Sequence, residues 1–240
     1  GRRNRFQINF RNHRKIVVAD GKRAFIGGLN VGDEYMGRSA RFGPWRDTHL
    51  TIEGPAVQGI QLIFQEDWYW AAQETLALAW VPTQSAGGDQ SALVIPAGPA
   101  DELETCNLFF VHVIHMARQR LWITSPYFVP DLGVLNALQL AALRGVDVRI
   151  MLPEKPDHLL VYLSSFAYLP AMERAGVKIC RYQPGFLHQK ALLVDDDLAA
   201  IGTANLDNRS FRLNFELLVL LADRGFADQG LVLGGPRAVH

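Results

Sequence analysis

Two kinds of apolar segment alternate along the chain from residue 92 onward. Short apolar runs, typical of strands, occur at 93–95, 121–124, 146–152 and 177–182. Longer stretches typical of helices lie between them, at 102–118, 133–144 and 157–175, and two of these end at Gly145 and Gly176. Alternating strands and helices predict an α/β domain with mixed sheets flanked by helices.

Two strand–turn–strand units complete the pattern. Apolar runs at 16–19 and 24–26 flank the turn signal Asp20-Gly21, and runs at 191–194 and 198–201 flank a turn at 195–197. A helix is expected at 55–79, and strands at 48–52 and 217–221. Residues 82–91 are polar and contain glycine, which predicts a linker. We therefore expect a first half over 1–81, a linker over 82–91 and a second half over 92–240.

Both units carry the same five residues at the same spacing. From each histidine, a lysine follows at +2, an aspartate at +7, a glycine at +14 and an asparagine at +17. The copies are His13, Lys15, Asp20, Gly27 and Asn30, and His188, Lys190, Asp195, Gly202 and Asn205. Five fixed positions match a random start on the order of once in five million, so the motif is a genuine internal repeat. Histidine and lysine lie two apart on a strand and share one face.

Charge and composition narrow the possible partners. The chain is 49% hydrophobic with zero net charge. It contains no run of 18 apolar residues, so the sequence shows no membrane-spanning helix. Residues 1–23 nevertheless carry eight Lys and Arg against Asp20 alone. We expect a solvated arm over residues 1–5 and an anion site that includes Arg14 and Lys15. Cys106 and Cys180 are expected to be buried free thiols.

The paired motifs resemble those of the phospholipase D superfamily. Further segments are similar to the bacterial cardiolipin synthase family: 11–15, 27–30, 52–55, 125–130, 144–147, 175–178 and 206–216. The resemblance extends from about residue 8 to about 226 and implies two α/β halves related by a pseudo-two-fold axis, with one active site between them.

The chain departs from this family at its beginning. Only 12 residues precede His13, whereas the family's first half normally has a stretch of α/β structure there and two membrane helices before it. Residues 231–240 also lack the helical tail expected of the family. We therefore expect a fragment with an incomplete first half, in which the first hairpin has an unpaired edge and an exposed apolar face.

The resemblance implies transfer of a phosphatidyl group through a phosphohistidine, with no metal or cofactor. His13 is expected to be the nucleophile and His188 the general acid and base, although the pseudo-symmetry leaves this order open. Lys15 and Lys190 would stabilise charge, and Asn30 and Asn205 would donate hydrogen bonds to the phosphoryl oxygens. The two imidazoles should face each other across roughly 5–7 Å.

Carboxylates are expected to orient the two imidazoles. Asp47 lies 34 residues after His13, and Glu216 lies 28 residues after His188, each before a strand-like run. Asp20 and Asp195 complete the catalytic motif, but they fall at the turns, where a structural hydrogen-bonding role is favoured.

Several alternatives stay open at this stage. The same motifs occur in a phospholipase D or a phosphodiesterase nuclease, and a truncated chain could be a non-catalytic lipid-surface module. The expected partners are phosphatidylglycerol and a bacterial membrane surface, with no nucleic acid.

His112 and His115 have a metal-binding spacing, but a packed helix is the favoured interpretation. The aromatic cluster Trp68, Tyr69, Trp70 and Trp80 is expected to pack in the core rather than anchor a membrane, and Tyr127 and Phe128 could line a headgroup pocket.

Overall fold

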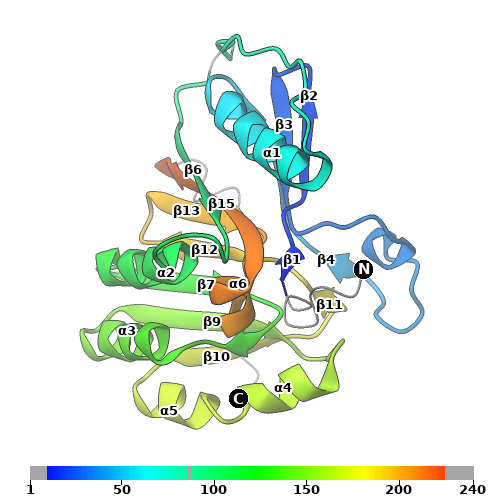
Figure 1. Ribbon diagram of the computed structural model, residues 1–240. Coiled ribbons are helices and arrows are strands. Elements are labelled where there is room, and N and C mark those ends of the chain that lie inside the picture. The colour runs from blue at the N-terminus through cyan, green and yellow to red at the C-terminus, as the bar shows by residue number, and fades with distance from the viewer. Residues whose placement is uncertain (1–9, 86–87, 225–240) are drawn as a thin grey trace.

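A large mixed sheet forms the base of the molecule (Figure 1). The computed structural model describes residues 10–85 and 88–224. The sheet has eight strands in the order β1-β15-β13-β12-β7-β9-β10, with β6 also paired to β15. These strands are β1 (Arg11–Asn12), β6 (Ser91–Ala97), β7 (Arg120–Thr124), β9 (Asp147–Pro153), β10 (Lys178–Tyr182), β12 (Ala191–Val194), β13 (Leu198–Gly202) and β15 (Asn214–Ala222). Because β7, β9 and β10 are parallel while β12 and β13 are antiparallel to their neighbours, the α/β class with mixed sheets is confirmed.

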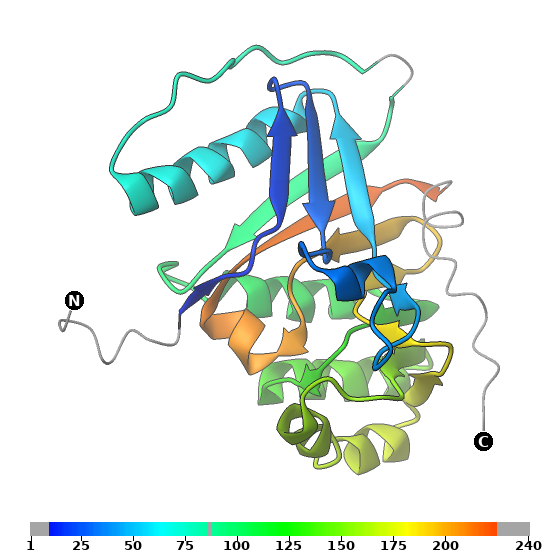
Figure 2. The ribbon, with the colours of Figure 1, turned by 90° about the vertical axis from the view of Figure 1, so that its right-hand side faces the viewer.

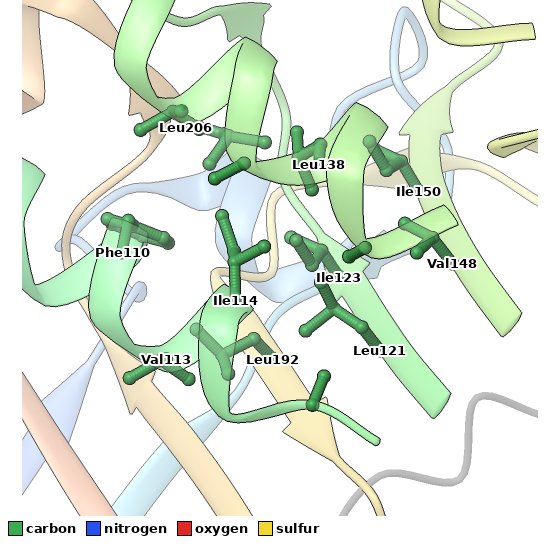
Figure 3. Packing of buried hydrophobic residues seen from close by; sticks show 14 of the residues in the cluster. Phe110, Val113, Ile114, Leu121, Ile123, Leu138, Val148, Ile150, Leu192 and Leu206 are labelled. Carbon is green, nitrogen blue, oxygen red and sulfur yellow. The ribbon is translucent and has the colours of Figure 1, made fainter. Parts of the chain in front are cut away.

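Helices cover one face of this sheet. They include α2 (Thr105–Met116), α3 (Leu132–Leu143), α5 (Leu169–Arg174) and the short α6 (Asn208–Arg212). Ile123 and Leu192 of the sheet pack in one cluster with Ile114 and Leu138 of the helices (Figure 3). Each fully buried aliphatic side chain contributes about 1.5–3 kcal/mol, so this core makes the second half a stable base for the site.

The first half is a smaller layer beside the large sheet. Its strands β2 (Ile16–Ala19), β3 (Arg23–Gly27) and β5 (His49–Glu53) form an antiparallel sheet, which α1 (Ala56–Ala72) contacts. A 3-10 helix, η1 (Asp33–Met36), and β4 (Trp45–Arg46) lie between β3 and β5. Figure 2 shows this sheet standing above the large one.

A second apolar core joins the two halves. Ile26 and Leu50 of the small sheet and Ile60 of α1 are buried in one cluster with Leu193 and Ile201 of the large sheet. Alternate residues of β12 therefore face different cores, since Leu192 lies in the helix-covered cluster. This alternation explains why all four residues of β12 are buried and apolar.

The two repeat hairpins have the same register. Ile16 pairs with Ile26 in the first and Ala191 with Ile201 in the second. The turns also match, because Asp20 and Asp195 both have positive φ angles, of 54° and 51°. The internal repeat in the sequence is therefore a structural repeat.

Two predicted helices are shorter than expected. The stretch at 157–175 forms two helices, α4 (Leu159–Ser165) and α5, because Pro170 near the start of α5 has no N–H to continue the preceding turn. The helix at 55–79 ends at Ala72, where Gln73 adopts a left-handed conformation. In both places a local change of backbone conformation ends the helix, although the apolar pattern of the sequence continues beyond it.

The aromatic cluster at the end of α1 and just after it is exposed, so its expected place in the core is wrong. Trp70 is 76% exposed and Trp68 is 37% exposed. The helix instead buries Val57, Ile60 and Ile63, which lie earlier in the helix than the aromatic residues.

The small sheet has a free edge, as expected. Within the residues that the structure describes, β2 pairs with β3 alone, and Val17 on its outer face is 60% exposed. Cys106 is buried and Cys180 is partly buried, and both are free. No helix in the described ranges is long and apolar enough to cross a membrane.

Candidate active site

The two histidines lie where the halves meet. His13 lies between β1 and β2, and His188 lies between β11 (Phe186–Leu187) and β12. The backbone N–H of His13 donates to the carbonyl of Phe215 at 2.9 Å, and that of His188 donates to the carbonyl of Arg46 at 2.8 Å. Each histidine backbone is therefore bonded to the other half of the molecule.

Each imidazole contacts a carboxylate from the opposite half. His13 Nδ1 lies 3.0 Å from Glu216 Oε1, and His188 Nδ1 lies 2.7 Å from Asp47 Oδ2. Both carboxylate side chains are 0% exposed. An ionised carboxylate accepts from an N–H, so this contact puts the imidazole proton on Nδ1 and leaves the Nε2 lone pair for chemistry. The structure thus brings the two expected carboxylates to the two imidazoles in a crossed arrangement.

Two short parallel ladders produce this crossing. β1 pairs with β15 so that Asn12 lies opposite Phe215, and the next residues along both strands are His13 and Glu216. β4 pairs with β11 so that Arg46 lies opposite Leu187, and the next residues are Asp47 and His188. Each ladder is two residues long and joins the halves, so the same local device builds both contacts.

Glu216 is held by neutral donors as well as by His13. Its carboxylate accepts hydrogen bonds from the Thr203 hydroxyl, from Ser210 Oγ at 2.9 Å and from Asn214 Nδ2 at 3.0 Å. These donors satisfy a charge that would be costly to bury alone. None of the three was predicted from the sequence, although each lies within or next to segments that carry the family resemblance.

The repeat glycines let the carboxylate strands approach closely. A Cβ at Gly27 would lie 2.3 Å from the carbonyl oxygen of Thr48, the residue after Asp47. A Cβ at Gly202 would lie 2.2 Å from the carbonyl oxygen of Leu217, the residue after Glu216. The glycine at +14 in each motif is therefore required for the strand that carries the orienting carboxylate.

The two lysines lie in the same electrostatic site. Lys15 Nζ donates to the carbonyl of His13 at 2.7 Å, and Lys190 Nζ donates to the carbonyl of His188. Burial lowers the pKa of Lys15 to about 8, although Glu216 and Asp47 raise it. Burial also lowers the pKa of Lys190 to about 7, with Asp47 opposing and Lys15 adding to the effect. A bound phosphate would offset the cost of burying these ammonium groups, so the arrangement suits an anionic ligand.

The surroundings of His188 favour its neutral form when no ligand is bound. Burial and the neighbouring Lys190 lower the pKa of His188 to about 4, while Asp47 raises it. His188 Nδ1 lies 2.7 Å from both Asp47 Oδ2 and Lys190 Nζ. One nitrogen cannot donate to the carboxylate and also accept from the ammonium, so we assign its proton to the Asp47 contact and Lys190 to the backbone carbonyl.

The two asparagines follow the same crossed pattern. Asn30 Nδ2 donates to the Tyr35 hydroxyl, and the Tyr35 ring lies 5.8 Å edge-on from the His188 ring. The Asn205 backbone N–H donates to Ser210 Oγ at 3.0 Å, within the network around Glu216. Asn205 Oδ1 is buried and has no hydrogen-bond partner among the described residues, so this oxygen can accept a hydrogen bond from a ligand.

Aromatic rings surround His188. Trp45 and Phe186 lie 5.2 Å and 6.1 Å from its ring. Both residues belong to the β4–β11 ladder, and their rings pack around the His188 side chain, which is 9% exposed. No repeat signal marks them, because they have no counterparts in the spacing pattern.

Arg14 is not an anion ligand, and the prediction for it is wrong. Its guanidinium donates to the Glu216 carbonyl at 3.0 Å, to Asp67 at 2.7 Å and to the Ala97 carbonyl at 3.2 Å. Through these three hydrogen-bond partners, the Arg14 guanidinium links α1 and β6 to β15. Lys15 alone of that pair lies at the site.

Asp20 and Asp195 lie at the hairpin turns, away from the histidines. The Asp195 carboxylate accepts hydrogen bonds from the backbone N–H groups of residues 118–120. Burial opposes ionisation there, but these backbone bonds lower the pKa of Asp195. Asp195 thus fastens the turn to the start of β7, which is a structural role.

Two other expectations concern residues outside this cluster. The Tyr127 hydroxyl donates to Asp157, two residues before α4, and burial raises the pKa of Tyr127. His112 and His115 are exposed on α2, and no group of three or more potential metal ligands occurs within residues 10–85 and 88–224.

Paired His-Lys motifs that exchange carboxylates across two α/β halves define a phospholipase D-like (PLD-like) class of protein. The family described as "Cardiolipin synthase, PLD-like domain" matches residues 110–231. The chain belongs to this cardiolipin synthase family of PLD-like proteins.

Known proteins support this membership. The chain is 58% identical over 226 residues to cardiolipin synthase A of Pseudomonas putida and 57% identical over 229 residues to that of Pseudomonas aeruginosa. These matches cover 94% and 95% of this chain but 47% and 46% of the relatives, so the chain spans about half the length of the curated relatives it matches. The crystal structure of phosphatidylserine synthase from Haemophilus influenzae is similar in fold, with a TM-score of 0.66, 16% sequence identity, and coverage of 93% of this chain and 61% of that chain.

Proposed function

We propose that the protein transfers a phosphatidyl group between two phosphatidylglycerol molecules, forming cardiolipin and releasing glycerol. The observation that carries this proposal is the pair of crossed imidazole–carboxylate contacts beside Lys15 and Lys190. Phosphodiester exchange requires a nucleophile, a proton donor for the leaving alcohol and cations for the non-bridging oxygens. Membership of the cardiolipin synthase family supports a phospholipid as the substrate.

The reaction proceeds in two displacements. Nε2 of His13 attacks the phosphorus of the donor lipid, and the bond from phosphorus to the glycerol oxygen breaks as His188 gives that oxygen a proton. A hydroxyl of the second phosphatidylglycerol then gives its proton to His188 and attacks phosphorus. The phosphorus–nitrogen bond breaks, which releases cardiolipin and restores both imidazoles.

The protonation of His188 bears on the order of roles. Without a ligand, the pKa of His188 is about 4, lowered by burial and Lys190, and a neutral imidazole suits a nucleophile. A bound phosphodiester brings a negative charge next to Lys190, which favours the protonated form that an acid needs. We therefore keep His13 as the nucleophile, and the reversed order is the competing assignment.

The lysines supply the charge that a metal supplies in other phosphoryl-transfer sites. Lys15 and Lys190 are the cations of the site, and an anion bound between the halves favours their charged forms. We propose that the reaction needs no metal ion or cofactor.

The test is conversion of phosphatidylglycerol by full-length protein that contains this chain. We expect cardiolipin and glycerol in equal amounts, unchanged turnover in EDTA, and loss of product in His13→Ala and His188→Ala. A donor lipid labelled at phosphorus should label His13 and not His188 in rapidly quenched protein, and labelled His188 would reverse the roles. Phosphatidic acid as the main product, or cleavage of DNA without lipid transfer, would reject the synthase in favour of a phospholipase D or a nuclease.

We further propose that the protein works at a bacterial membrane surface, since its substrates would be bilayer lipids. Fractionation of cells that express the full-length protein tests this location. Recovery of the protein and its activity entirely in the fraction without membranes would contradict it.

A further inference from the structure

Apolar side chains are exposed on two segments, one from each half. On α4 and just after it, Leu160 is 80% exposed, Leu159 62%, Leu163 53% and Phe166 46%. On the segment around η1, Val31 is fully exposed and Met36 is 68% exposed. We call these six residues the apolar rim.

The helix α4 has its leucines turned outward. Among its residues only the small polar Ser165 is fully buried. A helix on the surface of a globular protein normally buries its apolar stripe and exposes its polar side. The core therefore does not explain why α4 is apolar, and the exposed leucines need a partner outside the chain.

Both segments of the rim flank the candidate site. Val31 follows Asn30, and Met36 follows Tyr35, whose ring lies 5.8 Å from the His188 ring. Asp157, two residues before α4, accepts from the Tyr127 hydroxyl and from Arg41, whose Nη2 lies 3.1 Å from the Asp157 carbonyl. Figure 2 shows η1 and α4 on the side of the molecule that faces the viewer.

Arginines border the rim. The Arg181 guanidinium lies 5.4 Å from the Tyr162 ring and 5.7 Å from the Phe166 ring, and the Arg41 guanidinium lies 4.8 Å from the Phe42 ring. The nearby carboxylates are Asp33, which is paired with Arg38, Asp157, which accepts from Tyr127, and Glu34 on η1. Arginines beside exposed leucines match the boundary between anionic headgroups and acyl chains.

We propose that the apolar rim inserts into the headgroup–acyl boundary of an anionic bilayer and holds the site at the membrane surface. When the rim is buried in the bilayer, a lipid can place its phosphodiester in the site while its acyl chains stay in apolar surroundings. This inference rests on the proposed function, because a bilayer substrate is what brings this side of the molecule to a membrane.

The test compares two leucine pairs on different helices. Leu160→Ser/Leu163→Ser changes the rim, and Leu140→Ser/Leu143→Ser changes an equally spaced pair on α3 that is 47% and 72% exposed. Leu143 precedes the start of β9, whereas α4 follows the end of β9, so the control pair lies toward the other end of the strand. We expect the rim variant to bind vesicles of phosphatidylglycerol and phosphatidylcholine at least tenfold more weakly, and the control variant to bind within twofold of wild type.

A labelled variant covers the case in which the double variant misfolds. A polarity-sensitive fluorophore on Leu160→Cys, in a Cys180→Ser background, should shift to the blue on adding these vesicles, and the same label on Leu143→Cys should not. Equal loss of binding in both leucine pairs, equal shifts of both labels, or binding independent of the phosphatidylglycerol fraction would overturn the inference. Leucine-dependent self-association of the chain without vesicle binding would assign the rim to a second copy and would also overturn it.

This outcome is separable from the proposed function. Transfer is measured on dispersed short-chain phosphatidylglycerol, which needs no bilayer. His13→Ala should abolish that transfer and leave vesicle binding intact. The rim variant should keep that transfer and lose vesicle binding.

Discussion

Replacing Glu216 by glutamine should slow transfer without unfolding the protein. The carboxylate is 0% exposed and accepts from His13 Nδ1 and from the side chains of Thr203, Ser210 and Asn214. Glutamine keeps the shape but removes the charge and turns one acceptor oxygen into a donor nitrogen. The best orientation puts that nitrogen next to Thr203, because the Thr203 hydroxyl can turn to the Leu217 carbonyl.

The size of the effect follows from these contacts. A hydrogen bond to a charged group contributes ~1.5–3 kcal/mol, against ~0.5–1.5 kcal/mol for a neutral one. The His13 contact therefore weakens by about 1–2 kcal/mol, which corresponds to roughly a 5- to 30-fold lower rate if the imidazole becomes cationic during the reaction. The Thr203 hydroxyl exchanges a charged acceptor for the neutral Leu217 carbonyl, which costs about 1–2 kcal/mol of stability, partly offset because a neutral side chain is cheaper to bury.

Product formation and unfolding are measured on the same preparations. Glu53→Gln is the matched control, since Glu53 pairs with Arg23 at the surface and its side chain is 41% exposed. We expect the control to keep wild-type activity and stability. A folded Glu216→Gln protein with the wild-type rate would show that this carboxylate does not assist His13.

Three further predictions test the rest of the site. Asp47→Asn should lower transfer by a similar factor of roughly 5 to 30, because His188 loses the same kind of charged contact, as a product assay will show. Burial lowers the pKa of Lys190 to about 7 from an unfolded value near 10.5. Between these two pH values the unfolded state binds more protons than the folded state, so stability should rise with pH. Lys190→Met should flatten that rise in melting curves recorded across this pH range. Asp195→Ala should cost about 1–3 kcal/mol in denaturant unfolding, because three backbone N–H groups lose an acceptor, while the folded fraction keeps its activity; equal loss from Asp20→Ala would contradict this assignment.

The strands and their pairing within each hairpin could be predicted because their signals are local. Residues 16–19 and 191–194 are apolar runs next to turn residues, and the repeat spacing shows that both units have the same form. The division of residues 157–175 into two helices was not predicted, because the apolar pattern continues through Pro170. The proline was the available signal, since it has no N–H to donate to the carbonyl one turn earlier in a continuous helix.

The contacts of Arg14 show what a count of charges along the sequence cannot predict. Counting charges over residues 1–23 places Arg14 and Lys15 in one basic patch, and adjacent positions suggest a shared anion. The structure separates them, because the Arg14 side chain reaches Asp67, 53 residues away on α1. A charge count cannot show which cations already have a partner, since that depends on the packing of a helix against the sheet.

The crossed contacts were beyond sequence reasoning for a stronger reason. The spacing suggests that Asp47 belongs with His13 and Glu216 with His188, since each carboxylate follows its own copy of the motif. The structure joins residues 203 and 141 positions apart instead, because β1 pairs with β15 and β4 pairs with β11. Two-residue ladders have almost no sequence signature, yet each one puts a histidine opposite a carboxylate at its next position. Each half therefore supplies a histidine and the carboxylate for the other half's histidine, so neither half forms the site alone, and any change that separates the halves must disable both imidazoles together.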